Sequence, residues 1–168
     1  MTLAAESTNL IKNGSFEQGM ALPETSRYVP VDDKAQAIAG WTVSRGTVDI
    51  CQALYWEAAE GSRSLDLNGN NAGGVSQTLA TTPGTLYQVE FALACNPAAT
   101  AAAMRVEVRS SKLQQSQDFK VSSEGHSLTQ MGWQRHAWQF TAQDTSTTIE
   151  FYSLTDGPSG PALDDVKG

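Results

Sequence analysis

The chain has 168 residues, of which 40% are apolar and 17% are charged, and its formal net charge at pH 7 is −7. This length predicts one domain, residues 1–168, with enough apolar side chains for a core. The scattered Lys and Arg form no electrostatic footprint for nucleic acid or anionic lipid, and no apolar run approaches the roughly 20 residues of a membrane helix. The first residues also lack the basic and apolar regions of a signal peptide, so a soluble chain without membrane insertion or export signal is expected.

Short alternating or continuous apolar segments, separated by Gly, Pro and polar residues, predict about ten β-strands. Little of the chain has helical periodicity, so these strands predict an all-β fold with two antiparallel sheets packed face to face, as in a jelly-roll sandwich. The predicted strands cover residues 38–43, 47–52, 62–67, 74–79, 86–94, 104–109, 113–121, 133–141, 147–154 and 162–166.

The segment 19–37 contains Pro23, Pro30 and two acidic residues without a sustained period, which predicts a long surface loop before the first strong strand. Such a loop either carries binding residues or is a solvated insertion. A second Gly-rich segment, 68–74, lacks the Gly-Lys-Ser/Thr end of a phosphate loop and is interpreted as a connection between strands.

Few residues suggest catalysis. The histidines, His126 and His136, lie close together in the sequence, and no Gly-x-Ser-x-Gly elbow precedes them. Cys51 and Cys95 are interpreted as two buried thiols, although one disulfide between them stays open. Any acidic chain contains pairs of carboxylates that could hydrolyse a glycoside, and only their separation in space decides whether they can. Since the sequence shows no specific catalytic motif, we expect no enzyme. The carboxylates available for such pairs are Asp49, Glu57, Glu60, Asp66, Asp164 and Asp165.

Two acidic motifs lie at opposite ends of the chain, one containing Glu17 and the other containing Asp164 and Asp165. If the terminal strands are neighbours, Glu17 and Asp164 converge beside main-chain carbonyl groups, and such an all-oxygen set suits calcium. The alternative is that these are ordinary acids of a turn and a strand end.

Several motifs occur in one order along the chain: Asn9-Leu-Ile-Lys-Asn-Gly-Ser-Phe-Glu17, Ile38-Ala-Gly-Trp-Thr-Val43, Val48-Asp-Ile50, Trp56-Glu-Ala-Ala-Glu-Gly-Ser-Arg-Ser-Leu-Asp-Leu-Asn-Gly69, Gly74-Val-Ser-Gln-Thr78, Pro83-Gly-Thr-Leu-Tyr87 and Gly160-Pro-Ala-Leu-Asp-Asp-Val166. Together they resemble the bacterial choice-of-anchor C family and its relatives in the plant cell-wall family called domain of unknown function 642. The opening and closing motifs are shared with carbohydrate-binding modules of the galactose-binding-like jelly roll.

This resemblance implies an extracellular or cell-surface β-sandwich that binds polysaccharide or another glycan. In similar modules the opening Glu and the closing Asp bind a structural calcium ion, which corresponds here to Glu17 and Asp164. Asp165 is the less direct neighbour, because strand alternation turns it to the opposite face.

A sugar site combines exposed aromatic faces with polar side chains that replace water around the hydroxyl groups. Trp41 and Trp138 are predicted core residues, and Trp133 is interpreted as a packing lid. The predicted glycan-binding residues are Trp56 in the first place, assisted by Tyr55 and Tyr28, with Arg27, Asp49 and Arg45 as polar companions.

Two function classes remain. The first is a non-catalytic carbohydrate-binding module, expected as a monomer with a structural calcium ion. The alternative is a cell-surface or matrix module that makes protein contacts for adhesion or assembly. An exposed aromatic cleft with polar neighbours favours the first, and a broad apolar patch favours the second. For Trp56, local packing is the competing interpretation.

Overall fold

The computed structural model describes residues 8–33 and 36–168, and the regular elements in those ranges are all β-strands. Within these ranges there is no helix that could cross a membrane. The strands are β1 (Tyr28–Val31), β2 (Thr42–Arg45), β3 (Val48–Gln52), β4 (Arg63–Asp66), β5 (Gly74–Ala80), β6 (Leu86–Cys95), β7 (Ala101–Arg109), β8 (Gln114–Ser122), β9 (Gln134–Thr141), β10 (Ser146–Ser153) and β11 (Pro161–Lys167).

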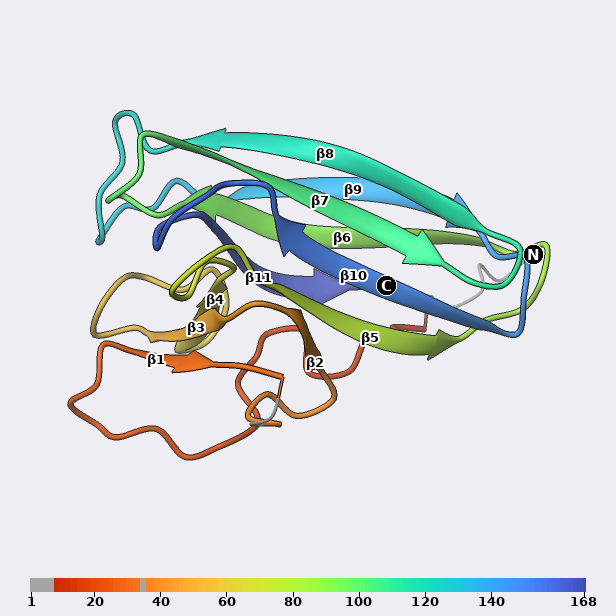
Figure 1. Ribbon diagram of the computed structural model, residues 1–168, viewed down its shortest axis with the longest axis horizontal. Helices are drawn as coiled ribbons and strands as arrows, with labels where there is room; N and C mark the ends of the chain where they lie inside the picture. Colours follow the sequence, from red (N-terminus) through yellow and green to blue (C-terminus); the bar gives the residue numbers. More distant parts are fainter. Residues whose placement is uncertain (1–7, 34–35) are drawn as a thin grey trace, which may run out of the picture.

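The strands form two antiparallel sheets. One has the order β1-β3-β4-β11-β6-β9 and the other the order β2-β5-β10-β7-β8. The chain crosses repeatedly from one sheet to the other, so strands distant in sequence become neighbours, as β10 does between β5 and β7 (Figure 1). This arrangement confirms the predicted all-β sandwich.

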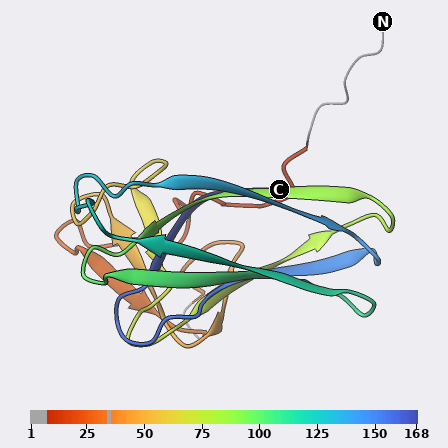
Figure 2. The same ribbon diagram turned by 90° about the horizontal axis from the view of Figure 1, so that it is seen from above.

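The first described residues lie beside the C-terminus, which Figure 2 shows as the red segment running next to it. The main-chain N–H of Leu10 donates to the carbonyl oxygen of Gly168 at 2.8 Å, and that of Val166 donates to Gly14 at 2.9 Å. The opening motif is therefore held against β11, which places the two acidic motifs next to each other.

Each predicted strand overlaps an observed one. The prediction of a loop over residues 19–37 is wrong where β1 lies, because Tyr28–Val31 form a strand. This short strand pairs with β3 at the edge of the six-stranded sheet. Pro30 occupies a position in β1, and an edge strand tolerates Pro because one side of its backbone needs no hydrogen-bond partner. Because proline is rare within strands, Pro30 also prevents β1 from being predicted from the sequence.

Most of the core lies between the sheets, and strand alternation explains its composition. In β6, Val89, Phe91 and Leu93 are buried while Tyr87 is half-buried, and Met104, Val106 and Val108 of β7 also face inward. Trp41 and Trp138 are buried as predicted, and three phenylalanines of the strands, Phe91, Phe140 and Phe151, are buried with them. Cys51 and Cys95 are buried free thiols.

A second, smaller apolar cluster covers the outer face of the six-stranded sheet. Trp56 and Met131 come from loops, and they pack on Cys51, Ala94 and Ala162 of three strands. Tyr55 and Trp133 pack around this cluster while remaining partly accessible. The cluster therefore excludes water from this part of the outer face, and the polar residues of the face lie beside the cluster.

Candidate functional site

A pocket of about 260 Å³ opens on the outer face of the six-stranded sheet, where β1, β3 and β4 lie side by side. Three of the predicted glycan-binding residues meet there. They are Tyr28 of β1, Asp49 of β3 and Tyr55 of the loop after β3. The remaining lining residues are Pro30, Cys51, Asp66, Gly69, Asn70, Asn96, Pro158 and Ser159.

Two tyrosines form the aromatic wall of this pocket. The ring centroids of Tyr28 and Tyr55 are 5.3 Å apart, and the rings are inclined at 50°. Tyr28 is 49% exposed, whereas Tyr55 is half-buried because its other face stacks on Trp56 at 5.3 Å. Tyr28 thus offers a ring surface to a ligand, and Tyr55 supports it.

Two carboxylates form the floor of the pocket. Asp49 and Asp66 are directly opposite each other in the register of β3 and β4. Asp66 is 1% exposed and accepts hydrogen bonds from the main-chain N–H of Asn68 and from Nδ2 of Asn96, both at 2.8 Å. Burial raises the pKa of Asp66 to about 7 against the effect of these hydrogen bonds.

The second carboxylate of the floor, Asp49, has surroundings that differ from those of Asp66. It is 8% exposed, and burial alone raises the pKa of its carboxyl to about 6. None of the described residues donates a hydrogen bond to its carboxylate. Asp49 lines the pocket, so its carboxylate is available to a ligand that brings hydroxyl or other donor groups.

The prediction that Trp56 is an exposed binding residue is wrong. Trp56 is 1% exposed, and its Nε1 donates to Oγ of Ser64 at 2.6 Å. The loop after β3 folds back over the sheet and turns the indole into the second apolar cluster. The neighbouring Tyr55 is left at the surface, so the aromatic pair divides into one packing and one accessible residue.

The two predicted arginine companions lie elsewhere. The main-chain carbonyl of Arg27 accepts a hydrogen bond from Gln52, and Arg27 is exposed outside the pocket lining. Arg45 belongs to β2 of the other sheet, where its guanidinium carbon lies 3.6 Å above the ring of Tyr152. The structure therefore separates Arg45 from Tyr28, Tyr55 and Asp49.

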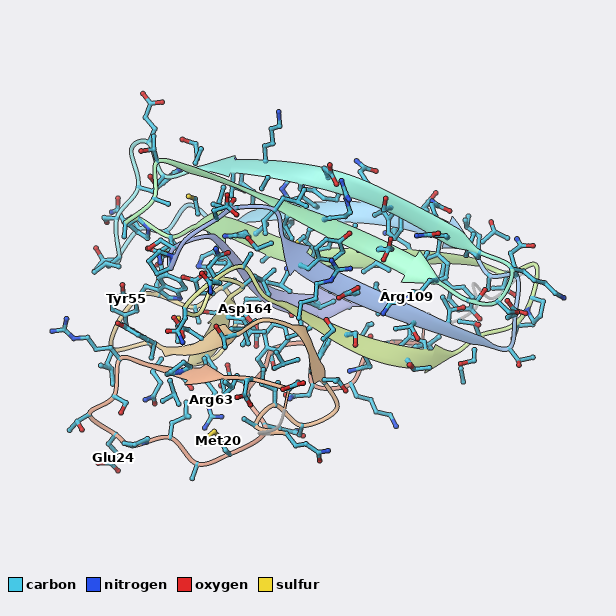
Figure 3. All side chains as sticks on the ribbon, in the orientation of Figure 1. Met20, Glu24, Tyr55, Arg63, Arg109 and Asp164 are labelled. Carbon is cyan, nitrogen blue, oxygen red and sulfur yellow. The ribbon has the colours of Figure 1, made fainter. Side chains whose placement is uncertain are left out.

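Arg45 belongs to a charged network on the outer face of the five-stranded sheet, which sequence reasoning missed. Glu150 of β10 is 1% exposed and accepts from Oγ of Ser44 at 2.6 Å, Nε of Arg45 at 2.8 Å and Nη1 of Arg109 at 2.7 Å. Burial would raise the pKa of Glu150, but these hydrogen bonds outweigh it and lower the pKa. Figure 3 shows Arg109 well separated from Tyr55.

The predicted metal residue Glu17 is positioned by a tight turn. Asn13 and Phe16 adopt positive φ, and a Cβ at Gly14 would lie 1.8 Å from the carbonyl oxygen of Val166, so only glycine fits against β11. Glu17 Oε1 accepts from the main-chain N–H groups of Ser62 and Arg63 at 2.9 and 2.8 Å.

Asp164 reaches the same loop from the other end of the chain. It is fully buried, and its Oδ2 accepts from the main-chain N–H of Glu60 at 2.9 Å. Burial and, to a smaller extent, the nearby charge of Glu17 raise its pKa to about 7. Asp165 has a positive φ at a bulge in β11, where strand alternation does not hold, and its carboxylate pairs with Nη1 of Arg135 at 2.8 Å.

The four carboxylate oxygens of Glu17 and Asp164 accept hydrogen bonds from main-chain N–H groups and from Oγ of Ser62. Two carboxylates converge there, and in the described part of the chain neither forms an ion pair with a basic side chain. Within residues 8–33 and 36–168, no three His, Cys, Asp or Glu side chains gather into a metal cluster. Any further ligands would have to be oxygens of the main chain, of other side chains or of water, which calcium accepts.

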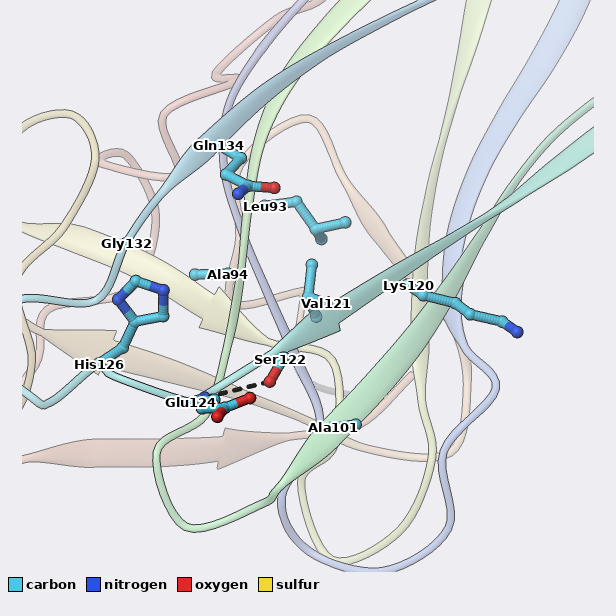
Figure 4. A pocket seen from close by; sticks show the side chains of 10 residues that line it. All are labelled: Leu93, Ala94, Ala101, Lys120, Val121, Ser122, Glu124, His126, Gly132 and Gln134. Carbon is cyan, nitrogen blue, oxygen red and sulfur yellow. Dashed lines mark hydrogen bonds between the residues drawn. The ribbon is translucent and has the colours of Figure 1, made fainter.

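A larger pocket, of about 500 Å³, lies at the start of β9 and the end of β8 (Figure 4). His126 is exposed, and its ring lies against Gly132, where a Cβ would be 2.3 Å from the imidazole. Lys120 extends away from this ring. The pocket contains none of the predicted glycan or metal residues and no aromatic side chain other than His126.

Solved structures with the same fold include three carbohydrate-binding modules. TmCBM61 in complex with β-1,4-galactotriose has a TM-score of 0.57 at 17% identity, covering 96% of this chain and 97% of that one. The family 16 carbohydrate-binding module-2 has a TM-score of 0.58 at 17% identity, covering 94% and 97%. The CBM22-1 xylan-binding domain of Xyn10C from Paenibacillus barcinonensis has a TM-score of 0.57 at 17% identity, covering 98% and 96%. These similarities show the jelly-roll fold.

Sequence relatives extend over nearly the whole chain. Halomucin of Haloquadratum walsbyi is 28% identical over 171 residues, which is 99% of this chain and 2% of halomucin. Protein DUF642 L-GALACTONO-1,4-LACTONE-RESPONSIVE GENE 2 of Arabidopsis thaliana is 30% identical over 173 residues, 95% of this chain and 45% of the plant protein. The chain thus spans less than half of either relative. Residues 9–167 match the family described as Protein of unknown function (DUF642), and the chain belongs to this family.

Proposed function

We propose that this chain is a non-catalytic carbohydrate-binding module and that the pocket between Tyr28 and Tyr55 holds one sugar unit of a wall or matrix polysaccharide. The observation that carries the proposal is that the exposed ring of Tyr28 lines the same pocket as Asp49, a carboxylate to which no residue in the described part of the chain donates a hydrogen bond. The similar folds of carbohydrate-binding modules support it.

The chemistry of the lining suits a pyranose ring. The apolar face of a sugar packs on an aromatic ring, while its hydroxyl groups exchange hydrogen bonds with carboxylates and amides. Tyr28 would supply the ring, Asp49 would accept from hydroxyl groups, and the exposed Asn70 would contribute an amide. The volume of about 260 Å³ lies just below the usual range for ligand pockets, about 300–1,000 Å³, which suits one unit of a longer chain.

A structural calcium ion is part of the proposal. Glu17 and Asp164 would hold it, and a bound ion supplies the positive charge that two converging carboxylates lack. Its place beside the loop 59–63 would fix that loop against β11. The buried carboxyl of Asp164, with Glu17 as its charged neighbour, supports this assignment.

A module that binds polysaccharide would work outside the cell or at its surface, and we expect it to act as a monomer. The proposed role includes no catalytic cleavage or modification of the glycan. Purified protein should leave bound oligosaccharides intact, as measured by chromatography of the recovered glycan.

The direct test is a glycan array followed by calorimetric titration of the glycans that bind. Tyr28→Ala and Asp49→Asn should each weaken binding about tenfold, which corresponds to about 1.4 kcal/mol. Asp118→Asn on β8 is the matched control because Asp118 is exposed on the other sheet and pairs with Arg105. Binding that is unaffected by both pocket variants would place the glycan elsewhere, and binding of no glycan at all would favour a module for protein contacts.

A further inference from the structure

The pocket that we assign to a sugar has an unbalanced charge. Its lining contains the two carboxylates Asp49 and Asp66, and no Lys, Arg or His is among the lining residues within the described part of the chain. The nearest basic residue in the sequence, Arg27, lies outside the lining, and Arg45 is bound to Glu150 on the other sheet. The chain as a whole carries a formal charge of −7.

Burial restricts the side chains of Asp49 and Asp66, so both carboxylates stay in the pocket when a ligand binds. Both are more than nine-tenths buried, and they face each other across neighbouring strands. Asp66 is fixed by Asn68 and Asn96, whereas Asp49 has no donor of its own among the described residues. A ligand in this pocket therefore meets one carboxylate that is already partnered and one that requires a donor.

This geometry discriminates between sugars by charge. A neutral pyranose brings hydroxyl donors to Asp49 and adds no charge to the pocket. A uronic acid brings a third carboxylate into a partly desolvated pocket where no basic side chain neutralises it, and like charges in such surroundings repel strongly. An amino sugar brings an ammonium group, which both the carboxylates and the tyrosine rings attract.

We infer that the pocket excludes uronic acids and accepts neutral or amino sugars, so the polysaccharide partner presents uncharged or positively charged units. This inference rests on the proposed glycan-binding function and adds its substrate class. Selection arises from Asp49 and Asp66, since the described residues that line the pocket include no Lys, Arg or His.

The test uses sugars that differ in one group. The methyl glycosides of galactose and galacturonic acid, and those of glucose and glucuronic acid, are titrated at about pH 8, where both carboxyl groups are mostly ionised. Glucosamine is titrated at about pH 7, where its amino group is mostly protonated, and it should bind at least as tightly as glucose. Chemical shifts of the labelled protein report both affinity and location. In each series that binds, the neutral sugar should bind at least about tenfold more tightly than its uronate, and the difference should shrink in about 1 M salt, which screens charge.

Two variants separate charge from folding. Asp49→Asn should reduce the difference in affinity between neutral and acidic sugars. The melting temperature of this variant establishes that it folds. Asn70→Lys places a positive charge at the exposed rim while its main-chain hydrogen bond to Thr47 remains, and it should reduce or reverse the selectivity. Asp118→Asn should leave the selectivity unchanged.

The outcomes distinguish this inference from the function on which it rests. Equal binding of uronates and neutral sugars in this pocket overturns the charge selection and leaves the glycan-binding function standing. Unchanged selectivity in both Asp49→Asn and Asn70→Lys also overturns it. Failure of the wild-type protein to bind any sugar, on the array or in titration, overturns the glycan-binding function and the selectivity together.

Discussion

Glu17 and Asp164, which lie 147 residues apart in the sequence, accept hydrogen bonds from the same short loop. Glu17 binds the main-chain N–H groups of Ser62 and Arg63, and Asp164 binds that of Glu60. The two ends of the chain are thereby joined through the loop before β4. A cation between these carboxylates would strengthen a connection that the hydrogen bonds already make.

Calcium should therefore raise the stability of the fold. Binding to the native state alone increases the free energy of unfolding by mass action, about 2.7 kcal/mol when the free ion is at 100 times its dissociation constant. Thermal melts in calcium and in chelator should differ for the wild type and for Asp118→Asn, and Asp164→Ala should remove the difference. Identical wild-type melts in the two buffers would contradict the calcium assignment.

Trp56→Ala should destabilise the protein by about 3–5 kcal/mol, the usual cost of removing a large buried aromatic side chain. Trp41→Ala should cost a similar amount, since both indoles are buried and donate a hydrogen bond from Nε1. Tyr28→Ala, which removes a half-exposed ring, should cost much less. Denaturant unfolding measures all three, and a Trp56→Ala variant as stable as Tyr28→Ala would show that the second apolar cluster is not needed.

The stability of the fold should depend on the protonation of Asp49. Its folded pKa of about 6 lies above its ordinary value, so the native state holds this proton to higher pH than the unfolded chain. The contribution is therefore favourable at low pH and is lost as pH rises toward and through about 6. When the pH is raised from about 5 to about 8, the free energy of unfolding should fall less for Asp49→Asn than for the wild type. Unfolding curves of both proteins in one chelating buffer give the comparison, and parallel losses would mean that the carboxyl is not buried in solution.

Glu150→Gln should destabilise the protein by roughly 1–3 kcal/mol, because it weakens the hydrogen bonds that Arg45 and Arg109 make to a buried carboxylate. Asp118→Asn also breaks an ion pair with an arginine, but both side chains are substantially exposed, so its effect should be below about 1 kcal/mol. Chemical denaturation of the two variants tests this. Equal effects would indicate that the network on the five-stranded sheet is solvated.

Strand alternation predicts much of this fold from the sequence. The inward residues of β6 and β7 follow from period two because one face of each strand is buried between the sheets. β1 is not predictable in this way, since it has four residues and contains Pro30, and it becomes a strand only by pairing with β3. Pairing at a sheet edge depends on the rest of the fold.

The candidate site is predictable only in part. An irregular segment correctly indicates that Tyr28 and Tyr55 reach the surface, but it does not show that Trp56 turns inward onto Ser64. Asp66 could be recognised by its place between Leu65 and Leu67, where an acid in an apolar run marks the outer face of a strand. Its opposition to Asp49 follows from the register of β3 and β4, which the sequence does not specify.

The location of a bound glycan is the most direct test of the central claim. An oligosaccharide identified on the array is titrated into labelled protein, and the chemical shifts that move are mapped on the structure. The claim predicts movement at Tyr28, Asp49, Tyr55 and Asn70, and none at Arg45 or Tyr152 on the opposite sheet. Movement confined to Arg45, Tyr152 and their neighbours on the five-stranded sheet would contradict it.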